Sequence, residues 1–164
     1  MRNISGIDKV GGVQTNSSAE FSRQVGTATS LMLQTKEYPH YALACVKVWL
    51  YPPILMRQIR FFYDYRGQPI GYVTWAFLSD DVVDKLKHDP RFILHDSEWN
   101  EGCNVWIMDF VAISGYARDL VGKLAESEFL DCALVKSARR RTDGTLGRVS
   151  NWRRRSIGEA PVHD

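Results

Sequence analysis

The amino-acid sequence predicts a single domain in which a mixed, mostly antiparallel sheet is flanked by helices, an α/β (α+β) layer architecture. Three observations predict it. Two helical segments with apolar periodicity come first, an aromatic-rich β-hairpin follows, and a strand, a helix and two further strands complete the chain. The expected domain covers residues 17–155, with flexible tails over residues 1–16 and 156–164.

The first helix is predicted over residues 18–34, because the run Ser-Ser-Ala-Glu from Ser17 fits a capping box and apolar residues then recur at helical spacing. Pro39 disfavours helix at the residue before it and suits the first turn of a new one, expected over residues 41–50. The proline pair at positions 52–53 is expected to end that second helix.

A hairpin is the clearest supersecondary signal in the sequence. Residues 57–65 alternate and are rich in aromatic side chains, Arg-Gly-Gln at 66–68 forms a turn, and residues 69–78 form the returning strand. A short helix over residues 82–87 and a polar loop over residues 89–102 are expected to follow.

The last third of the chain begins with a strongly apolar run over residues 104–113, which is typical of a central strand. A helix over residues 116–129 comes next, and another strand begins near residue 132. Thr-Asp-Gly-Thr at 142–145 is a hairpin-type turn, which predicts that residues 146–152 pair back on the preceding strand.

Composition limits the classes of function. The 164 residues are 45% apolar and 24% charged, as in ordinary soluble proteins, and a net charge of +2 gives no general case for nucleic-acid or membrane binding. Three cysteines outside any CxxC pair argue against a disulfide framework or a metal site and fit a reducing cytosol. Because no signal-peptide pattern and no apolar run near ~20 residues is present, we expect a cytoplasmic protein without a transmembrane segment.

Asp109 stands in the middle of the apolar central strand. A buried carboxylate costs several kcal/mol unless something compensates it, so Asp109 needs a partner. One interpretation is a structural aspartate that bonds backbone amides at a β-bulge. The other is an aspartate that orients a catalytic base.

His40 is the histidine best placed to be that base. It follows Pro39 near a helix start, where the helix dipole disfavours imidazolium and keeps the ring neutral and able to accept a proton. A bond from Asp109 to one ring nitrogen would set the tautomer and raise the basicity of the other, whereas the alternative is a purely structural His40. Two other histidines, His88 and His95, lie in or beside the polar loop and are expected to be solvated, and the fourth is in the C-terminal tail.

No Gly-x-Ser-x-Gly elbow, P-loop or HExxH motif occurs, which disfavours serine hydrolases, P-loop nucleotide enzymes and zinc proteases. Arginines flank the last predicted hairpin, at Arg139, Arg140, Arg141 and Arg153 among others. They are either a solvated edge that blocks strand pairing or a dock for an acidic or phosphate-bearing partner. Aromatic interleaving suited to base stacking is weak there, which counts against RNA.

Four segments resemble a known family. Gly-Tyr-Val-Thr-Trp-Ala-Phe-Leu-Ser at 71–79 resembles the AYCSWANLS strand of the RTX toxin-activating lysine acyltransferases. Residues 98–112 resemble that family's W-x-x-G-x-x-x-W-x-x-D-W-I-A-P segment, and Pro39-His40 falls where the family has S-P-L-H-R. Residues 148–153 are similar to its late R-V-K-E-Y strand.

The resemblance implies a fold related to the GNAT acetyltransferases. It also implies transfer of a fatty acyl group from acyl-carrier protein to the ε-amine of a lysine on an RTX-type protoxin. The family's catalytic histidine and aspartate correspond to His40 and Asp109, and a homodimer is implied as well. Glu37 and Tyr41 depart from the pattern on either side of the histidine, where the family has serine and arginine.

The loop after the central strand bears on the acyl donor. Acyl-CoA-using GNAT enzymes place a glycine-rich pyrophosphate loop there, and Ser-Gly-Tyr-Ala-Arg at 114–118 lacks that pattern. Acyl-carrier protein presents a phosphopantetheine thioester without a free pyrophosphate, and its acidic surface would suit Arg139, Arg140, Arg141 and Arg153. We therefore expect no bound cofactor. Two rivals stay open: an acyl-CoA-dependent N-acetyltransferase, and a non-catalytic binding module of the same fold.

Overall fold

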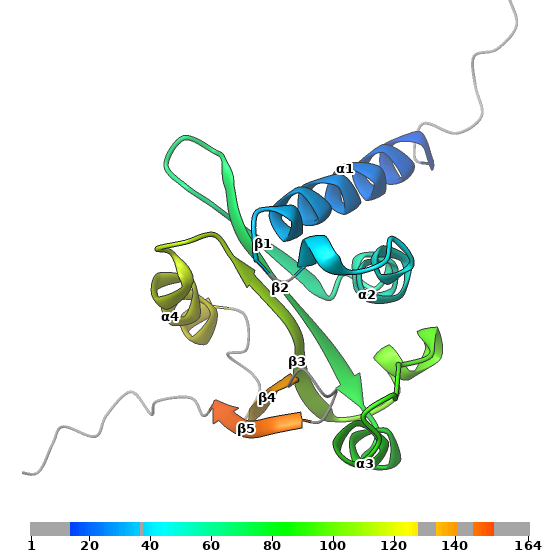
Figure 1. The fold of residues 1–164 in the computed structure, drawn as a ribbon. Coiled ribbons are helices and arrows are strands. Elements are labelled where there is room, and N and C mark those ends of the chain that lie inside the picture. The colour runs from blue at the N-terminus through cyan, green and yellow to red at the C-terminus, as the bar shows by residue number, and fades with distance from the viewer. Residues whose placement is uncertain (1–13, 37, 128–133, 141–145, 153–164) are drawn as a thin grey trace, which may run out of the picture.

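A computed structural model describes residues 14–36, 38–127, 134–140 and 146–152, and it confirms the predicted mixed sheet flanked by helices (Figure 1). The predicted order of helices and strands is also confirmed, with two additional 3₁₀ turns. The elements are α1 (Gln14–Leu33), η1 (Tyr38–His40), α2 (Ala44–Leu55), β1 (Ile59–Tyr63), β2 (Pro69–Leu78), α3 (Asp80–His88), η2 (Asp96–Trp99), β3 (Asn104–Ala112), α4 (Ala117–Ser127), β4 (Val135–Arg140) and β5 (Leu146–Trp152).

The sheet has five strands in the order β1-β2-β3-β4-β5. All neighbouring pairs are antiparallel except β3 and β4, which run parallel, so the sheet is mixed and mostly antiparallel as predicted. Helices α1 and α2 cover one face of the sheet and α4 covers the other (Figure 1). No helix within the described segments is long and apolar enough to cross a membrane.

The predicted capping box of the first helix is wrong. Helix α1 begins at Gln14, inside the expected N-terminal tail, so Ser17 lies within the helix and does not cap it. The Glu20 carboxylate does not reach back, because Arg23 and Gln24 donate hydrogen bonds to it at 2.6–2.7 Å from the next turn. Residues 1–13 and 153–164, which hold most of both expected tails, lie outside the described residues.

The expectation that the proline pair ends the second helix is also wrong. Helix α2 begins at Ala44 and continues through Pro52 and Pro53 to Leu55. Each proline removes one intrahelical hydrogen bond, but its fixed φ is helical and both rings are buried. The backbone N–H groups of Met56 and Gln58 close the last turn on the carbonyls of the two prolines, at 3.0 and 2.7 Å.

The remaining elements lie close to their predicted ranges. The first strand of the hairpin is shorter than expected, and the turn follows the sequence signal, with Gly67 at a φ of 76°. The predicted polar loop contains η2, which the sequence did not indicate; its start is held by a reciprocal capping box between His95 and Glu98. The predicted turn over residues 142–145 lies outside the described residues.

A β-bulge interrupts the pairing of β2 with β3. Thr74 is the partner of Asp109, whereas the next residue, Trp75, is the partner of Ile107, so Met108 is the extra residue of β3. Partners in a ladder point to the same face. The bulge therefore changes the phase of β3: Trp106, Met108 and then Asp109 all face the side of the sheet that α1 and α2 cover.

Candidate active site

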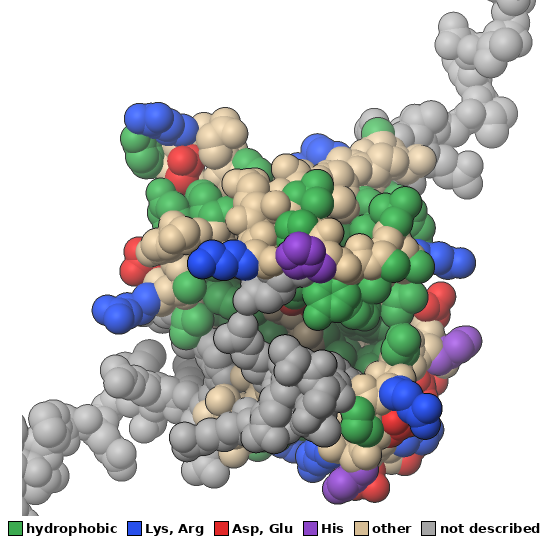
Figure 2. Space-filling model, in the orientation of Figure 1, with side chains coloured by type: hydrophobic (Ala, Val, Ile, Leu, Met, Phe, Trp, Pro, Cys, Tyr) green, Lys and Arg blue, Asp and Glu red, His purple; other side chains and the backbone are tan. Residues whose placement is uncertain are grey.

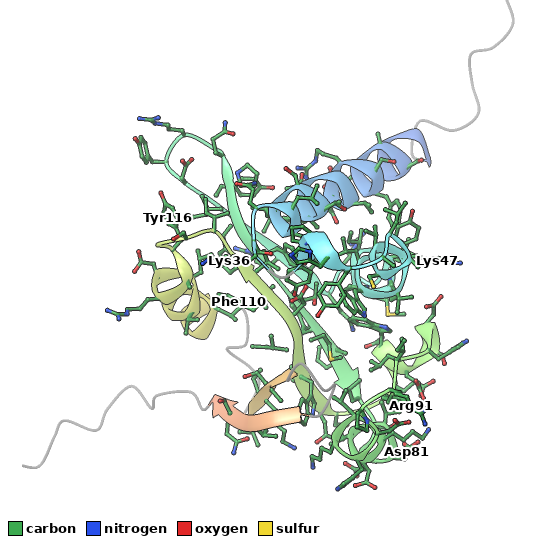
Figure 3. The ribbon with its side chains drawn as sticks, in the orientation of Figure 1. Lys36, Lys47, Asp81, Arg91, Phe110 and Tyr116 are labelled. Carbon is green, nitrogen blue, oxygen red and sulfur yellow. The ribbon has the colours of Figure 1, made fainter. Side chains whose placement is uncertain are left out.

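Asp109 and Tyr72 meet on the face of the sheet below α1 and α2. Tyr72 is completely buried, packs in the cluster that joins α1 and α2 to the sheet, and donates its hydroxyl hydrogen to Asp109 Oδ2 at 2.7 Å. Phe110, the next residue of β3, points to the opposite face and packs against the α4 side, as Figure 3 shows. The alternation of the strand after the bulge thus separates the carboxyl from the α4 core.

Tyr38 supplies a second hydroxyl to the same carboxyl. Its hydroxyl donates a short hydrogen bond to Asp109 Oδ1, and the two residues are 71 positions apart in the chain. The backbone N–H of Phe110 is a third donor to the carboxyl. Asp109 is therefore a carboxyl surrounded by donors from η1, β2 and β3, without a cationic partner among these contacts.

Burial dominates the electrostatics of this cluster. It raises the pKa of Asp109 above the ordinary value for a carboxyl, and the hydrogen bonds from Tyr38, Tyr72 and the Phe110 amide offset only part of that effect. Burial, together with the nearby carboxylate, also raises the pKa of Tyr72, which stays a hydroxyl donor at all ordinary pH values. Asp109 is thus a carboxyl whose pKa is raised by burial and lowered in part by the surrounding donors.

Aromatic packing holds Tyr38 in place. Its ring centroid lies 6.4 Å from that of Trp49 in an edge-on arrangement and 5.8 Å from that of Tyr41, while Tyr41 and Trp49 are 5.2 Å apart. The backbone N–H of Tyr38 also reaches the Thr35 hydroxyl at 3.4 Å, at the end of α1. Helix α2 and the end of α1 together fix the short turn η1.

His40 is the last residue of η1, two positions after Tyr38, and its side chain is exposed. Within the described part of the chain it makes no hydrogen bond or ion pair, so the structure does not join His40 and Asp109 directly. The connection between them is indirect: Tyr38 binds the aspartate, and His40 ends the same turn. The catalytic assignment of both residues stays a prediction.

Thr74 belongs to the same face as Asp109 and Tyr72. Its side chain is completely buried, and its hydroxyl has no hydrogen-bond partner among the described residues. A buried hydroxyl without a partner costs about 1–3 kcal/mol. The site therefore contains an unused polar group directly across the ladder from the aspartate.

The other predicted residues stand apart from this cluster. The side chains of Arg139 and Arg140 and all of Arg141 and Arg153 lie outside what the structure describes, so their proposed docking role stays a prediction. His88 and His95 are exposed and make local contacts, with Asp84 and Ser97 respectively. Among the described residues, no three histidine, cysteine, aspartate or glutamate side chains form a group that could hold a metal.

Hydrophobic side chains also gather on the surface over η1 and α2 (Figure 2). Tyr41 and Leu43 are 54% and 83% exposed, and Leu55 is 69% exposed at the other end of α2. Two exposed hydrophobic side chains, Tyr41 and Leu43, therefore follow His40 in the chain.

Sequence reasoning identified Asp109 and His40 but missed Tyr38, Tyr72 and Thr74. Tyr72 and Thr74 were present in the strand segment that resembles the family, so their alternation with Val73 could have placed them on one face. Tyr38 is next to Pro39-His40, but no local pattern connects it with a strand residue 71 positions later.

Comparison with known proteins identifies the family. A family model described as the RTX toxin acyltransferase family matches residues 17–153. Lysine-acyltransferase RtxC of Vibrio cholerae is 29% identical over 115 residues, which are 68% of this chain and 72% of that protein. Leukotoxin-activating lysine-acyltransferase LktC of Mannheimia haemolytica is 33% identical over 91 residues, 56% of this chain and 52% of that protein.

Two further matches carry no information about activity. The protein sll0720 of Synechocystis, described as uncharacterized, is 29% identical over 121 residues, 73% of this chain and 81% of its own. A crystal structure of Chaetomium thermophilum Naa20 with a bisubstrate analogue has 18% sequence identity and a TM-score of 0.34, covering 75% of this chain and 60% of its own, which is too distant to bear on fold or activity. Because the family model spans nearly the whole described chain, this protein belongs to the RTX toxin acyltransferase family.

Proposed function

We propose that this protein transfers a fatty acyl group from acyl-carrier protein to the ε-amine of an internal lysine of an RTX-type protoxin, and so activates the protoxin. Family membership supports acyl transfer, and the relatives RtxC and LktC are by name lysine-acyltransferases. The observation that carries the proposal is the Asp109 carboxyl, enclosed by the Tyr38 and Tyr72 hydroxyls, below the turn that ends at His40.

The reaction needs a base. A lysine ammonium, with a reference pKa near ~10.4, must lose a proton before its nitrogen can attack the thioester carbonyl carbon. The first proton of the ammonium is released to solvent. As the amine attacks and the amide C–N bond forms, His40 takes a second proton from the nitrogen, the C–S bond breaks, and His40 passes its proton to the leaving thiolate. Asp109 stabilises the cation that His40 becomes, acting through the turn that Tyr38 anchors. Attack through a covalent acyl-histidine is a variant with the same overall balance.

The negative charge on the carbonyl oxygen also needs donors. A bulge leaves backbone groups outside the regular ladder, and the extra residue here is Met108, next to Asp109. A backbone amide at this position is suited to hold the oxyanion close to the base. The location of the bulge supports this role, because Met108 lies next to Asp109 and opposite the part of β2 that contains Thr74.

Donor choice separates the proposal from its first rival. The purified protein is incubated with an RTX protoxin fragment and either palmitoyl-acyl-carrier protein or palmitoyl-CoA, and the fragment is then measured by intact mass and peptide mapping. We expect one palmitoyl amide per modified lysine with the carrier-protein donor. Transfer from CoA alone would identify an acyl-CoA-dependent N-acyltransferase.

His40→Ala and Asp109→Ala are the matched variants, and His88→Ala is the control, because His88 is exposed and has a local partner. We expect the first two to abolish transfer and the control to retain it. If no variant changes the effect of the protein on the protoxin, and no acyl group is transferred, the protein is a binding module.

Docking of the carrier protein is proposed for Arg139, Arg140, Arg141 and Arg153. A triple charge reversal, R139E/R140E/R153E, should raise the KM for acyl-carrier protein and leave the KM for palmitoyl-pantetheine unchanged, since that small donor has no acidic surface. Arg66→Glu, an exposed arginine in the β1–β2 turn, is the control. An unchanged KM for acyl-carrier protein would exclude this docking site.

A further inference from the structure

We propose that Tyr38 is a positioning residue, whose hydroxyl holds the Asp109 carboxyl and ties the His40 turn to the central strand. The part that concerns Asp109 does not depend on the reaction that the protein catalyses. The part that concerns catalysis rests on the proposed function.

The contacts of Tyr38 reach in two directions. Its ring packs against Trp49 of α2 and Tyr41, and its hydroxyl donates to Asp109 Oδ1 on β3. Of the two tyrosine hydroxyls that bind Asp109, the one from Tyr38 comes from the helical layer, whereas the one from Tyr72 comes from β2 within the sheet. Loss of the Tyr38 hydroxyl would remove that connection between the layers and leave the aromatic packing in place.

Tyr38 stands at a position where this chain departs from the family pattern. In the family pattern S-P-L-H-R, aligned on His40, the residue two places before the histidine is proline, which has no hydroxyl. Here that residue is Tyr38, and it lies between the departure at Glu37 and the one at Tyr41, whose ring packs against it. With Pro39 in place of leucine, four departures fall in one short segment, and Tyr38 and Tyr41 among them pack against each other.

The consequence for Asp109 has a definite sign. The hydrogen bonds from Tyr38 and Tyr72 both lower the pKa of a carboxyl that burial raises. Without the Tyr38 hydroxyl, burial is unchanged and one stabilising donor to the carboxylate is missing, so Asp109 must titrate at a higher pH than in the wild type. A role in packing alone would not produce such a shift.

The direct test is a carbon-13 NMR titration of the aspartate carboxyls, with Asp109 assigned by its loss in Asp109→Asn. Tyr38→Phe keeps the ring and should move the Asp109 midpoint to higher pH. Tyr72→Phe should shift it in the same direction, because it removes the other hydroxyl. Tyr41→Phe, in the same aromatic cluster but without a bond to Asp109, should leave the midpoint unchanged.

A second variant keeps the test valid if Tyr38→Phe does not fold. Ring-fluorinated tyrosine at position 38 is a stronger hydrogen-bond donor of nearly the same size, so the Asp109 midpoint should move to lower pH. Midpoints that stay at the wild-type value in both Tyr38 variants would overturn the inference.

The catalytic part is measured by the pH dependence of palmitoyl transfer from palmitoyl-acyl-carrier protein. In Tyr38→Phe we expect kcat to fall about tenfold, with the acid limb of its profile at higher pH and KM nearly unchanged. A lower rate without a displaced limb would overturn the positioning role. If the wild type transfers no acyl group while the NMR midpoint still responds, the proposed function fails and the assignment of Tyr38 to Asp109 stands.

Discussion

Thr74 and Asp109 are cross-strand partners at the point where the register of β2 and β3 slips by one residue. Before the slip, Trp106 and Met108 pack in the cluster that contains the buried side chains of α3, and Ile107 packs in the core on the α4 side. If Met108 were paired with Thr74 in a regular ladder, Asp109 would stand opposite Val73 and point into the α4 core, where Ile107 and its neighbours offer no polar contact. The bulge is therefore what brings the carboxyl within reach of the Tyr38 and Tyr72 hydroxyls.

Deletion of Met108 tests whether the bulge does more than orient Asp109. The deletion joins Ile107 to Asp109, which keeps Trp75 opposite Ile107 and Thr74 opposite Asp109 in a regular ladder. Asp109 stays on the same face, but the backbone groups freed by the bulge are paired. If one of them holds the oxyanion, kcat should fall about 10²–10³-fold while circular dichroism stays native. A folded deletion variant with wild-type kcat would exclude the bulge amide as an oxyanion donor.

Asp109→Asn should change the pH dependence of stability in a predictable direction. Because the folded-state pKa of Asp109 is raised, the folded protein holds its proton more tightly than the unfolded chain, and the resulting stability is present at acid pH and is lost as pH rises through the folded pKa. Urea unfolding across the acid-to-neutral range should show the wild type losing up to about 1.4 kcal/mol per pH unit relative to the variant within that window. A difference that stays constant with pH would contradict a raised pKa.

The same residue shows how far sequence reasoning reaches. An isolated carboxylate in an apolar run is visible in the sequence. Asp109 lies at a bulge and accepts from a backbone amide, as the structural interpretation expects, whereas its role in orienting a catalytic base stays a prediction. Element order was predictable for a similar reason, since apolar periodicity is a local property that each helix and strand carries in its own residues.

Long-range contacts were not predictable in this way. The bond between Tyr38 and Asp109 depends on how η1 docks on the sheet and on a one-residue slip at Met108. Asp109 hints at a bulge, but no local signal marks Met108 as the extra residue, because it is apolar like Trp106 and Ile107. Similarly, Pro52 and Pro53 carry a strong local signal to end a helix, and burial of both rings in tertiary packing outweighs that signal.

Thr74→Val separates a structural cost from a chemical role. Valine has the same shape as threonine and removes a completely buried hydroxyl that has no partner among the described residues, so the free energy of unfolding should rise by about 1 kcal/mol. Chemical denaturation measures that change, and palmitoyl transfer is measured on the same sample. A more stable variant with lower kcat would show that the hydroxyl serves the reaction, whereas a destabilised variant would show that it has a bonding partner in the folded protein.

Gly102→Ala tests the close approach of the loop before β3 to the end of β2. The Gly102 N–H donates to the Phe77 carbonyl at 2.9 Å, and a Cβ at this position would lie 2.1 Å from the Leu78 carbonyl oxygen, so backbone must move. We expect a loss of about 3 kcal/mol or more in the free energy of unfolding, measured by urea denaturation.

Gly26→Ala is the matched control for that substitution. Gly26 is exposed within α1, and a Cβ added there would meet none of the described residues within 4 Å, so alanine should stabilise the protein by about 0.5–1 kcal/mol. Equal effects of the two substitutions would mean that the loop does not press against the end of β2.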